Sequence, residues 1–226
     1  MQVSEPSTAA KTEGVAHTRP PVERWLRWTG LVPLPAFLAL HLGRELWLAG
    51  ASEPSQLVRA PTSPFALVSA ALLVWLPFLL HCGLGLWLVS ANPRHLPADD
   101  VPRTARVLSR ACALVAFAFL LYHARAFPVA VLLGEADARD AGFRLVSELA
   151  SSSYGVPLQG GLYLLGVAAT LGHAGLGVHR ALLLEGMLTS PERRRASARM
   201  CASVAAALFV LGALAVIRVA TGGLLR

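Results

Sequence analysis

Five long apolar stretches constrain the fold of this chain more than any other feature. Each is long enough to cross about 30 Å of hydrocarbon as an α-helix, which takes roughly 20 residues. Of the 226 residues, 55% are hydrophobic and only 15% are charged, which leaves too few polar side chains to cover a soluble globule. We therefore expect an all-α membrane protein, a bundle of five transmembrane helices. The predicted helices are residues 28–49, 65–90, 106–133, 161–184 and 202–225.

Polar segments separate the apolar stretches and indicate the topology. Residues 1–22 are expected to form a disordered cytoplasmic segment before a five-helix domain at residues 23–226. Lysine and arginine gather in that segment and in the second and fourth connectors, whereas the first and third connectors hold fewer. Because positive charge favours cytoplasmic loops, the amino terminus is predicted to be cytoplasmic and the carboxyl terminus outside. This asymmetry accounts for the net charge of +7, so we expect no nucleic-acid partner.

One histidine lies inside each of the first four apolar stretches: His41, His81, His123 and His173. An imidazole in hydrocarbon has two nitrogens that need partners, so four such side chains require a shared partner or one another. With about 1.5 Å of rise per residue and the predicted topology, the four sort by depth into an outer pair, His41 with His123, and an inner pair, His81 with His173. Two haems, each held between two histidines, would form a path for electrons across the bilayer.

The inner pair has a second signature. His81 and His173 both begin the pattern H-x-G-L-G, which places Gly85 and Gly177 four residues after them. Residues i and i+4 lie on one helix face, so these glycines would leave room for a flat macrocycle. Ordinary close packing of membrane helices explains the glycines equally well.

Several basic residues are candidate contacts for haem propionates. Arg44 and Arg125 lie shortly after the two outer histidines, and a guanidinium can hold a carboxylate through two hydrogen bonds. Alternatively, both arginines reach the outer headgroups. Near the inner end, Arg180 is a further candidate, and His179 could contact a propionate or a quinone, or lie at the headgroups.

Other chemistry is excluded by missing motifs. The cysteines Cys82, Cys112 and Cys201 form neither C-x-x-C-H nor C-x-x-C, so a haem would be bound noncovalently, as type b. The chain has no glycine-rich phosphate loop and no soluble domain large enough for a nucleotide. We expect no catalytic residue in this chain itself, and its electrons must come from, or go to, another polypeptide.

A set of segments in order along the chain carries a family resemblance. The segments are Leu31-Val32-Pro33 leading to His41-Leu42, Leu76-Pro77 before His81 with Gly85-Leu86-Trp87 after it, Tyr122-His123, and Tyr163-Leu164-Leu165-Gly166 leading to His173 and Gly177. With them, the chain from about Arg24 to Ile217 resembles the five-helix dihaem cytochrome b anchor of succinate dehydrogenase and fumarate reductase, in its single-subunit form.

The resemblance implies a role for each histidine. His41 and His123 would hold a distal haem b, and His81 and His173 a proximal haem b next to an iron–sulfur subunit. That subunit would be bound to a flavoprotein that interconverts succinate and fumarate. This chain would then pass electrons between the iron–sulfur subunit and a quinone, with menaquinone as the expected species. The implied setting is the bacterial inner (cytoplasmic) membrane, where such complexes can form higher oligomers.

The resemblance also suggests a quinone site on the outer side, near the distal haem. Its candidate residues are Arg44, Glu45, Trp47, Tyr122 and Arg125, which could equally contact propionates or headgroups.

One departure concerns proton transfer. Some dihaem fumarate reductases carry a glutamate shortly before the second proximal ligand, and residues 168–172 hold no acid here, so we do not expect that proton path. Two rival hypotheses stay open: a dihaem anchor of another quinone-linked complex, and a haem-free proton relay or transporter whose histidines titrate.

Overall fold

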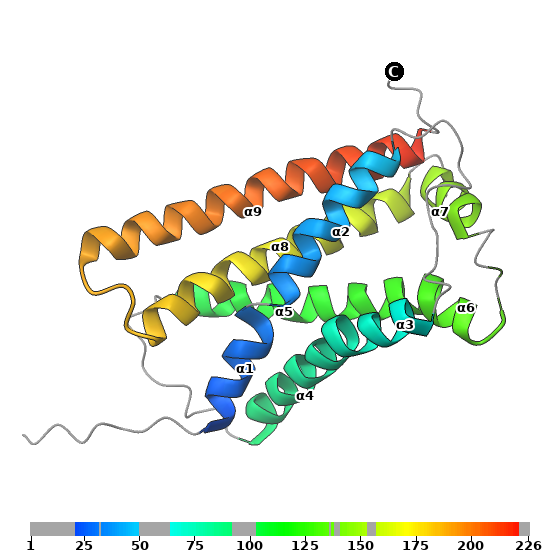
Figure 1. Ribbon diagram of the computed structural model, residues 1–226. Coiled ribbons are helices and arrows are strands. Elements are labelled where there is room, and N and C mark those ends of the chain that lie inside the picture. Colours follow the sequence, from blue (N-terminus) through cyan, green and yellow to red (C-terminus); the bar gives the residue numbers. More distant parts are fainter. Residues whose placement is uncertain are drawn as a thin grey trace, which may run out of the picture.

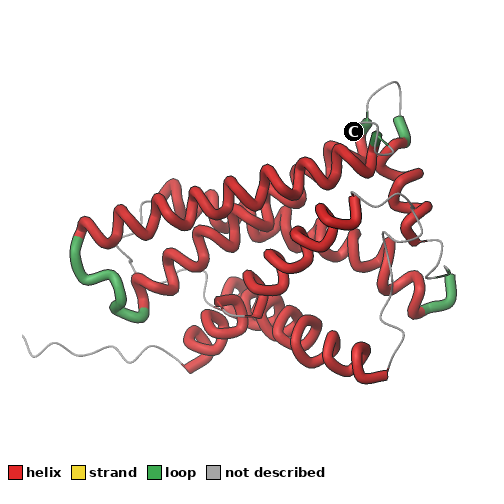
Figure 2. Tube along the Cα trace, turned by 45° about the horizontal axis from the view of Figure 1, so that its top comes forward, coloured by secondary structure: helices red, strands yellow, loops and turns green. Residues whose placement is uncertain are grey.

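The computed structural model describes residues 21–31, 33–49, 64–91, 103–135, 137, 141–152 and 157–221. The regular structure in these ranges is entirely helical (Figure 1, Figure 2). Four helices are long and apolar enough to cross a membrane: Val68–Leu88, Thr104–Ala124, Leu158–Leu184 and Pro191–Ala220. The chain is therefore an α-helical, multi-pass membrane protein. Residues 1–20, most of the segment predicted to be disordered, lie outside the described part of the chain.

The first apolar stretch forms two helices instead of the single helix predicted at residues 28–49. These are α1 (Pro21–Leu31) and α2 (Pro33–Ala49). Pro33 is the first residue of α2, a position that suits proline because its missing N–H would have no partner within the helix there. With 17 residues, α2 extends about 25 Å and is shorter than the four helices named above.

The second apolar stretch forms one rod with a π-helical turn inside it. It consists of α3 (Pro64–Ala70), the π-helix η2 (Ala71–Trp75) and α4 (Leu76–Ala91), close to the predicted helix at residues 65–90. Pro77 cannot donate the usual hydrogen bond to the preceding turn, which explains why the wider turn lies directly before it.

The third stretch repeats this arrangement. Helix α5 (Arg103–Ala124) continues through the π-helix η3 (Arg125–Val129) into the short α6 (Ala130–Leu132). Pro128 lies inside η3, so a proline again accompanies the wider turn. The predicted helix at residues 106–133 therefore has a π-helical turn in its last part.

Helix α7 (Ala141–Ala150) was not predicted, because its charged residues suggested a connector. Its side chains Leu145, Val146 and Leu149 share one face and pack against the core formed with Tyr163 of α8. Figure 1 shows α7 beside the carboxyl-terminal end of α9, at the same end of the bundle as α6. This short amphipathic helix closes that end of the bundle.

Helices α8 (Leu158–Leu184) and α9 (Pro191–Ala220) are the longest and lie side by side (Figure 1). The prediction that the last helix begins at residue 202 is wrong, because α9 begins at Pro191. The hydroxyl of Ser190 accepts a hydrogen bond from the backbone N–H of Arg193 at 3.3 Å, and a proline at the first helical position suits the helix start. Residues 222–226, which the prediction included in the helix, lie outside the described residues.

Glycines on α8 and α9 let neighbouring helices approach closely. A Cβ atom at Gly166 of α8 would overlap the ring of Phe119 on α5, and one at Gly212 of α9 would lie 2.9 Å from Cγ1 of Val167 on α8. Small residues at helix contacts are typical of membrane bundles, where packing replaces the hydrophobic effect. Helix α8 also contacts α1 and α7, so it forms the centre of the bundle.

We expect Gly166→Ala to destabilise the bundle by about 1–3 kcal/mol, because the added methyl group forces Phe119 away from α8. Thermal unfolding in detergent, followed by circular dichroism, would measure the change. Gly161→Ala is the matched control on the same helix, since its new methyl group would meet nothing within 4 Å. Equal stability of the two variants would contradict this account of the α5–α8 contact.

Candidate functional site

The outer pair joins α2 to α5. The ring centroids of His41 and His123 are 6.0 Å apart, with 65° between the ring planes. Each imidazole stacks on a phenylalanine one turn earlier in its own helix. The Phe37 ring lies 5.3 Å from His41, and the Phe119 ring lies 5.8 Å from His123. These stacked rings restrict the orientation of both imidazoles.

The inner pair joins α4 to α8. The ring centroids of His81 and His173 are 6.1 Å apart, with 62° between the ring planes. Nδ1 of His81 lies 3.1 Å from the Leu26 carbonyl oxygen on α1. The Ser109 backbone lies beside the His173 ring, but the buried Nδ1 of His173 has no partner in hydrogen-bond geometry among the described residues.

The two pairs lie at different levels of the bundle. Tyr163 of α8 touches the outer pair, since its ring centroid is 5.8 Å from that of His123. His173 is about ten residues further along the same helix, which corresponds to roughly 15 Å along its axis. The four histidines therefore form two separate sites. No group of three or more histidine, cysteine, aspartate or glutamate side chains that could hold a metal ion occurs in the described ranges.

The separation within each pair is compatible with a metal between the rings. Two metal–imidazole bonds of about 2 Å, together with the distances from each nitrogen to its ring centre, add up to roughly 6 Å. Aromatic rings packed edge to face have similar separations, so the distance alone does not distinguish the two arrangements.

Gly85 and Gly177 are not required for close contacts between the described helices. A Cβ atom at Gly177 would meet nothing within 4 Å, and one at Gly85 would meet only Leu26 Cδ1, at 3.9 Å. By contrast, a Cβ atom at Gly175 would lie 3.3 Å from the Ala205 Cβ on α9. Contacts between the described helices therefore explain Gly175 but not the two glycines that follow the histidines by four residues.

A polar cluster lies next to the outer pair. The Tyr122 hydroxyl on α5 donates a hydrogen bond to Oε1 of Gln159 on α8 at 3.2 Å, and its ring packs on that of Tyr163. Tyr163 is only 5% exposed, and its hydroxyl has no hydrogen-bond partner in the described ranges. The buried Oε2 of Glu148 on α7 also has no hydrogen-bond partner in the described ranges. The cluster thus combines proton-carrying groups with free hydrogen-bonding capacity.

Tyr163 and Glu148 are absent from the residues predicted for the site. The histidine pattern does not point to either of them. The apolar face of α7 was the available signal, because an amphipathic helix after the third stretch would have placed Glu148 at the end of the bundle.

The remaining outer candidates are dispersed over α2 and η3. Arg44 is exposed on α2, and Arg125 forms an ion pair with Glu135 at 2.6 Å. Glu45 and Trp47 belong to α2, but their side chains lie outside the described part of the structure. Among the three quinone candidates with described side chains, Tyr122 belongs to the polar cluster.

The inner end of the bundle is held together by polar contacts. Arg27 of α1 forms an ion pair with Glu185, directly after α8, at 2.9 Å. Nδ1 of His179 lies 3.1 Å from the buried hydroxyl of Ser197 on α9. Arg180 is half-buried on α8. His179 therefore links α8 to α9 and contacts neither histidine of the inner pair in the described structure.

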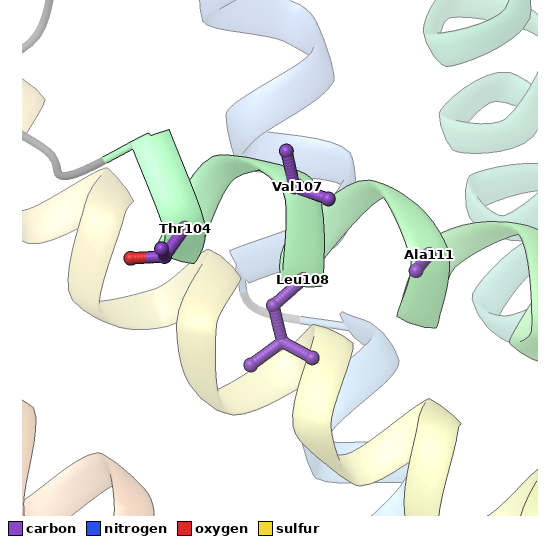
Figure 3. A pocket seen from close by; sticks show the side chains of 4 residues that line it. All are labelled: Thr104, Val107, Leu108 and Ala111. Carbon is purple, nitrogen blue, oxygen red and sulfur yellow. The ribbon is translucent and has the colours of Figure 1, made fainter.

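A shallow apolar groove runs along the first turns of α5, and none of the four paired histidines lines it. Figure 3 shows its lining side chains, Thr104, Val107, Leu108 and Ala111. All four are exposed and carry no chemistry beyond one hydroxyl group. Large exposed apolar side chains such as Leu79 on α4 are expected where helices face lipid, and the groove belongs to this surface.

Fold and site together define a helical membrane protein whose bundle contains two histidine pairs at different levels. Comparison of the chain with models of protein families, with curated proteins and with solved structures gives no match. The geometry of the histidine pairs is therefore the main basis for assigning a function.

Proposed function

We propose that this chain is the dihaem cytochrome b anchor of a succinate dehydrogenase or fumarate reductase. His41 and His123 would hold one haem b, and His81 and His173 the other. The observation that carries the proposal is the pairing itself. Four histidines from four apolar stretches meet as two pairs, and each pair joins helices that are distant in the sequence.

The surroundings of the pairs suit haem ligation. A ligating histidine usually donates its other ring N–H to a carbonyl or carboxylate oxygen, as His81 does toward Leu26. The open space beside Gly85 and Gly177 suits a flat group that extends beyond the imidazoles. The chain has no cysteine pattern for covalent attachment, so a bound haem would be of type b.

In this proposal, residues of the chain bind the two haems, orient the imidazoles that hold them and supply protons to a quinone. A bound haem supplies reversible one-electron chemistry between two iron oxidation states. Phe37 and Phe119 keep the outer imidazoles in place. Reduction of a quinone requires protons. Near the outer pair, the groups that can supply them are Tyr122, Tyr163 and Glu148. Arg44 remains a candidate propionate contact, whereas Arg125 is held by Glu135.

In the proposed membrane arrangement, α2 is the fifth crossing and the amino terminus is cytoplasmic. The inner pair then lies nearest the iron–sulfur subunit, which is bound to the flavoprotein. Three exposed arginines in the first two turns of α9 offer this partner a basic surface: Arg193, Arg194 and Arg195. In this proposal the membrane is the bacterial inner (cytoplasmic) membrane, and the quinone is menaquinone.

Two alternatives remain. An anchor of another quinone-linked complex would also use histidine pairs. A haem-free proton relay is also compatible with the ring separations, which match those of edge-to-face aromatic packing.

An absorption spectrum of the purified full-length chain tests the proposal. We expect a b-type spectrum with two haems per chain, which succinate reduces when the partner subunits are present. Haem that does not respond to succinate in the assembled complex would favour the anchor of another complex. A protein that binds no haem when expressed with haem in excess would contradict the proposal and favour the proton relay.

A further inference from the structure

Helix α1 contributes to the inner pair although it carries neither histidine. It packs against both α4 and α8, the helices that hold His81 and His173 (Figure 1). The Leu26 carbonyl oxygen lies 3.1 Å from Nδ1 of His81. A carbonyl oxygen can only accept a hydrogen bond, so Nδ1 of His81 carries the proton, and in the neutral imidazole Nε2 does not. The contact with α1 therefore selects the tautomer whose Nε2 lone pair is available to a metal.

Gly30 of α1 provides the space in which the His81 ring lies. A Cβ atom at Gly30 would be 2.5 Å from Cε1 and 2.8 Å from Nδ1 of His81. Side chains do not approach this closely, so any other residue at this position would displace the ring. A glycine inside a helix lowers its stability by roughly 0.5–1 kcal/mol relative to alanine. The position of the His81 ring gives a physical reason for a glycine at position 30 despite this cost.

Thr29 acts on the same carbonyl oxygen. Its hydroxyl lies 2.9 Å from the Trp25 carbonyl oxygen and 3.1 Å from that of Leu26, and it can donate to either. The Leu26 oxygen thus lies within hydrogen-bond distance of both the Thr29 hydroxyl and the N–H of His81. When the hydroxyl donates to Leu26, it draws electron density from that oxygen, which then accepts less strongly from His81.

We propose that Leu26, Thr29 and Gly30 form a positioning site that fixes the tautomer and orientation of His81 and tunes the reduction potential of the inner haem. This inference rests on the function proposed above. A stronger hydrogen bond from Nδ1 makes Nε2 more basic, which stabilises the oxidised iron and lowers the potential. The Ser109 backbone lies beside the His173 ring, but the buried Nδ1 of His173 has no hydrogen-bond partner in the described ranges, so the proposed tuning rests on the carbonyl contact from α1.

The first experiment compares Gly30→Ala with Gly83→Ala in the full-length chain in membranes. Gly83 lies two residues after His81, and a methyl group there would meet nothing within 4 Å. We expect Gly30→Ala to lower the affinity of the inner pair for haem by about 10- to 100-fold. The outer haem, read by optical and electron paramagnetic resonance spectra in the same sample, should be unchanged and reports that the bundle has folded. Gly83→Ala should keep both haems.

The outcomes separate this inference from the function on which it rests. A wild-type chain without haem would refute both. A wild-type chain with two haems and a Gly30→Ala variant with unchanged spectra and potentials would refute the positioning site alone.

A second pair of variants remains informative if Gly30→Ala does not assemble. Thr29→Val keeps the shape of the side chain but removes the hydroxyl, whereas Thr29→Ser keeps the hydroxyl. We expect Thr29→Val to shift the potential of the inner haem to a more negative value in a redox titration, with the outer potential unchanged and Thr29→Ser like wild type. An unchanged inner potential in Thr29→Val would overturn the proposed tuning.

Discussion

Replacement of His81 or His173 by alanine is expected to remove the inner haem and to leave the outer one in place. The haem content should fall from two to one per chain, because the inner haem would lose one of its two bonds from iron to the protein. Since the inner pair lies toward the proposed partner, docking of the iron–sulfur subunit should also weaken. Reduced-minus-oxidised spectra and a haem assay on the purified chain would measure the loss.

His179→Ala is the matched control for these variants. His179 lies on the same helix as His173, but it contacts Ser197 rather than an opposing histidine. Both haems should therefore survive its removal. If each single change at His81 and His173 removed both haems equally from a protein that still assembled, the pairing would be wrong.

Replacement of His41 or His123 is expected to have the complementary effect. The outer haem should be lost, while succinate still reduces the inner haem through the partner subunits. Quinone reduction should be abolished, because the outer pair and the polar cluster around Tyr163 lie roughly 15 Å along α8 from the inner pair.

Parallel assays of the assembled complex would separate the two steps. One follows succinate-dependent reduction of the inner haem, and the other follows the rate of quinone reduction. Wild-type rates of quinone reduction in a variant that lacks the outer haem would show that quinone does not receive its electrons there.

The partners of the four histidines follow from depth alone. Helices that cross a bilayer are tilted by only about 20° from its normal on average, so the position of a residue in its helix approximately sets its level. His41 and His123 share one level, His81 and His173 share another, and the structure places the rings of these same pairs about 6 Å apart. Haem ligation itself stays a prediction until the spectra are measured.

Three features of the helices were less predictable: the boundary between α1 and α2, the start of α9 and the presence of α7. Hydropathy identifies an apolar stretch but does not separate α1 from α2, although Pro33 marks the boundary. It also does not detect the polar first turns of α9, although Ser190 and Pro191 are recognisable start signals. Helix α7 was not predicted because ten residues of mixed polarity resemble a loop in the sequence. Such a short helix is stabilised mainly by packing its apolar face against a neighbouring surface.

By itself, the sequence determined the membrane class, the approximate positions of the apolar helices and the level of each histidine, because apolar length and helical rise are properties of each segment alone. Only the tertiary structure decided which side chains surround those histidines. The Leu26 carbonyl and Gly30 reach His81 from a helix far from it in sequence, and Tyr163 reaches His123 in the same way. Such contacts depend on how the helices rotate and pack against one another, which no pattern within a single segment records.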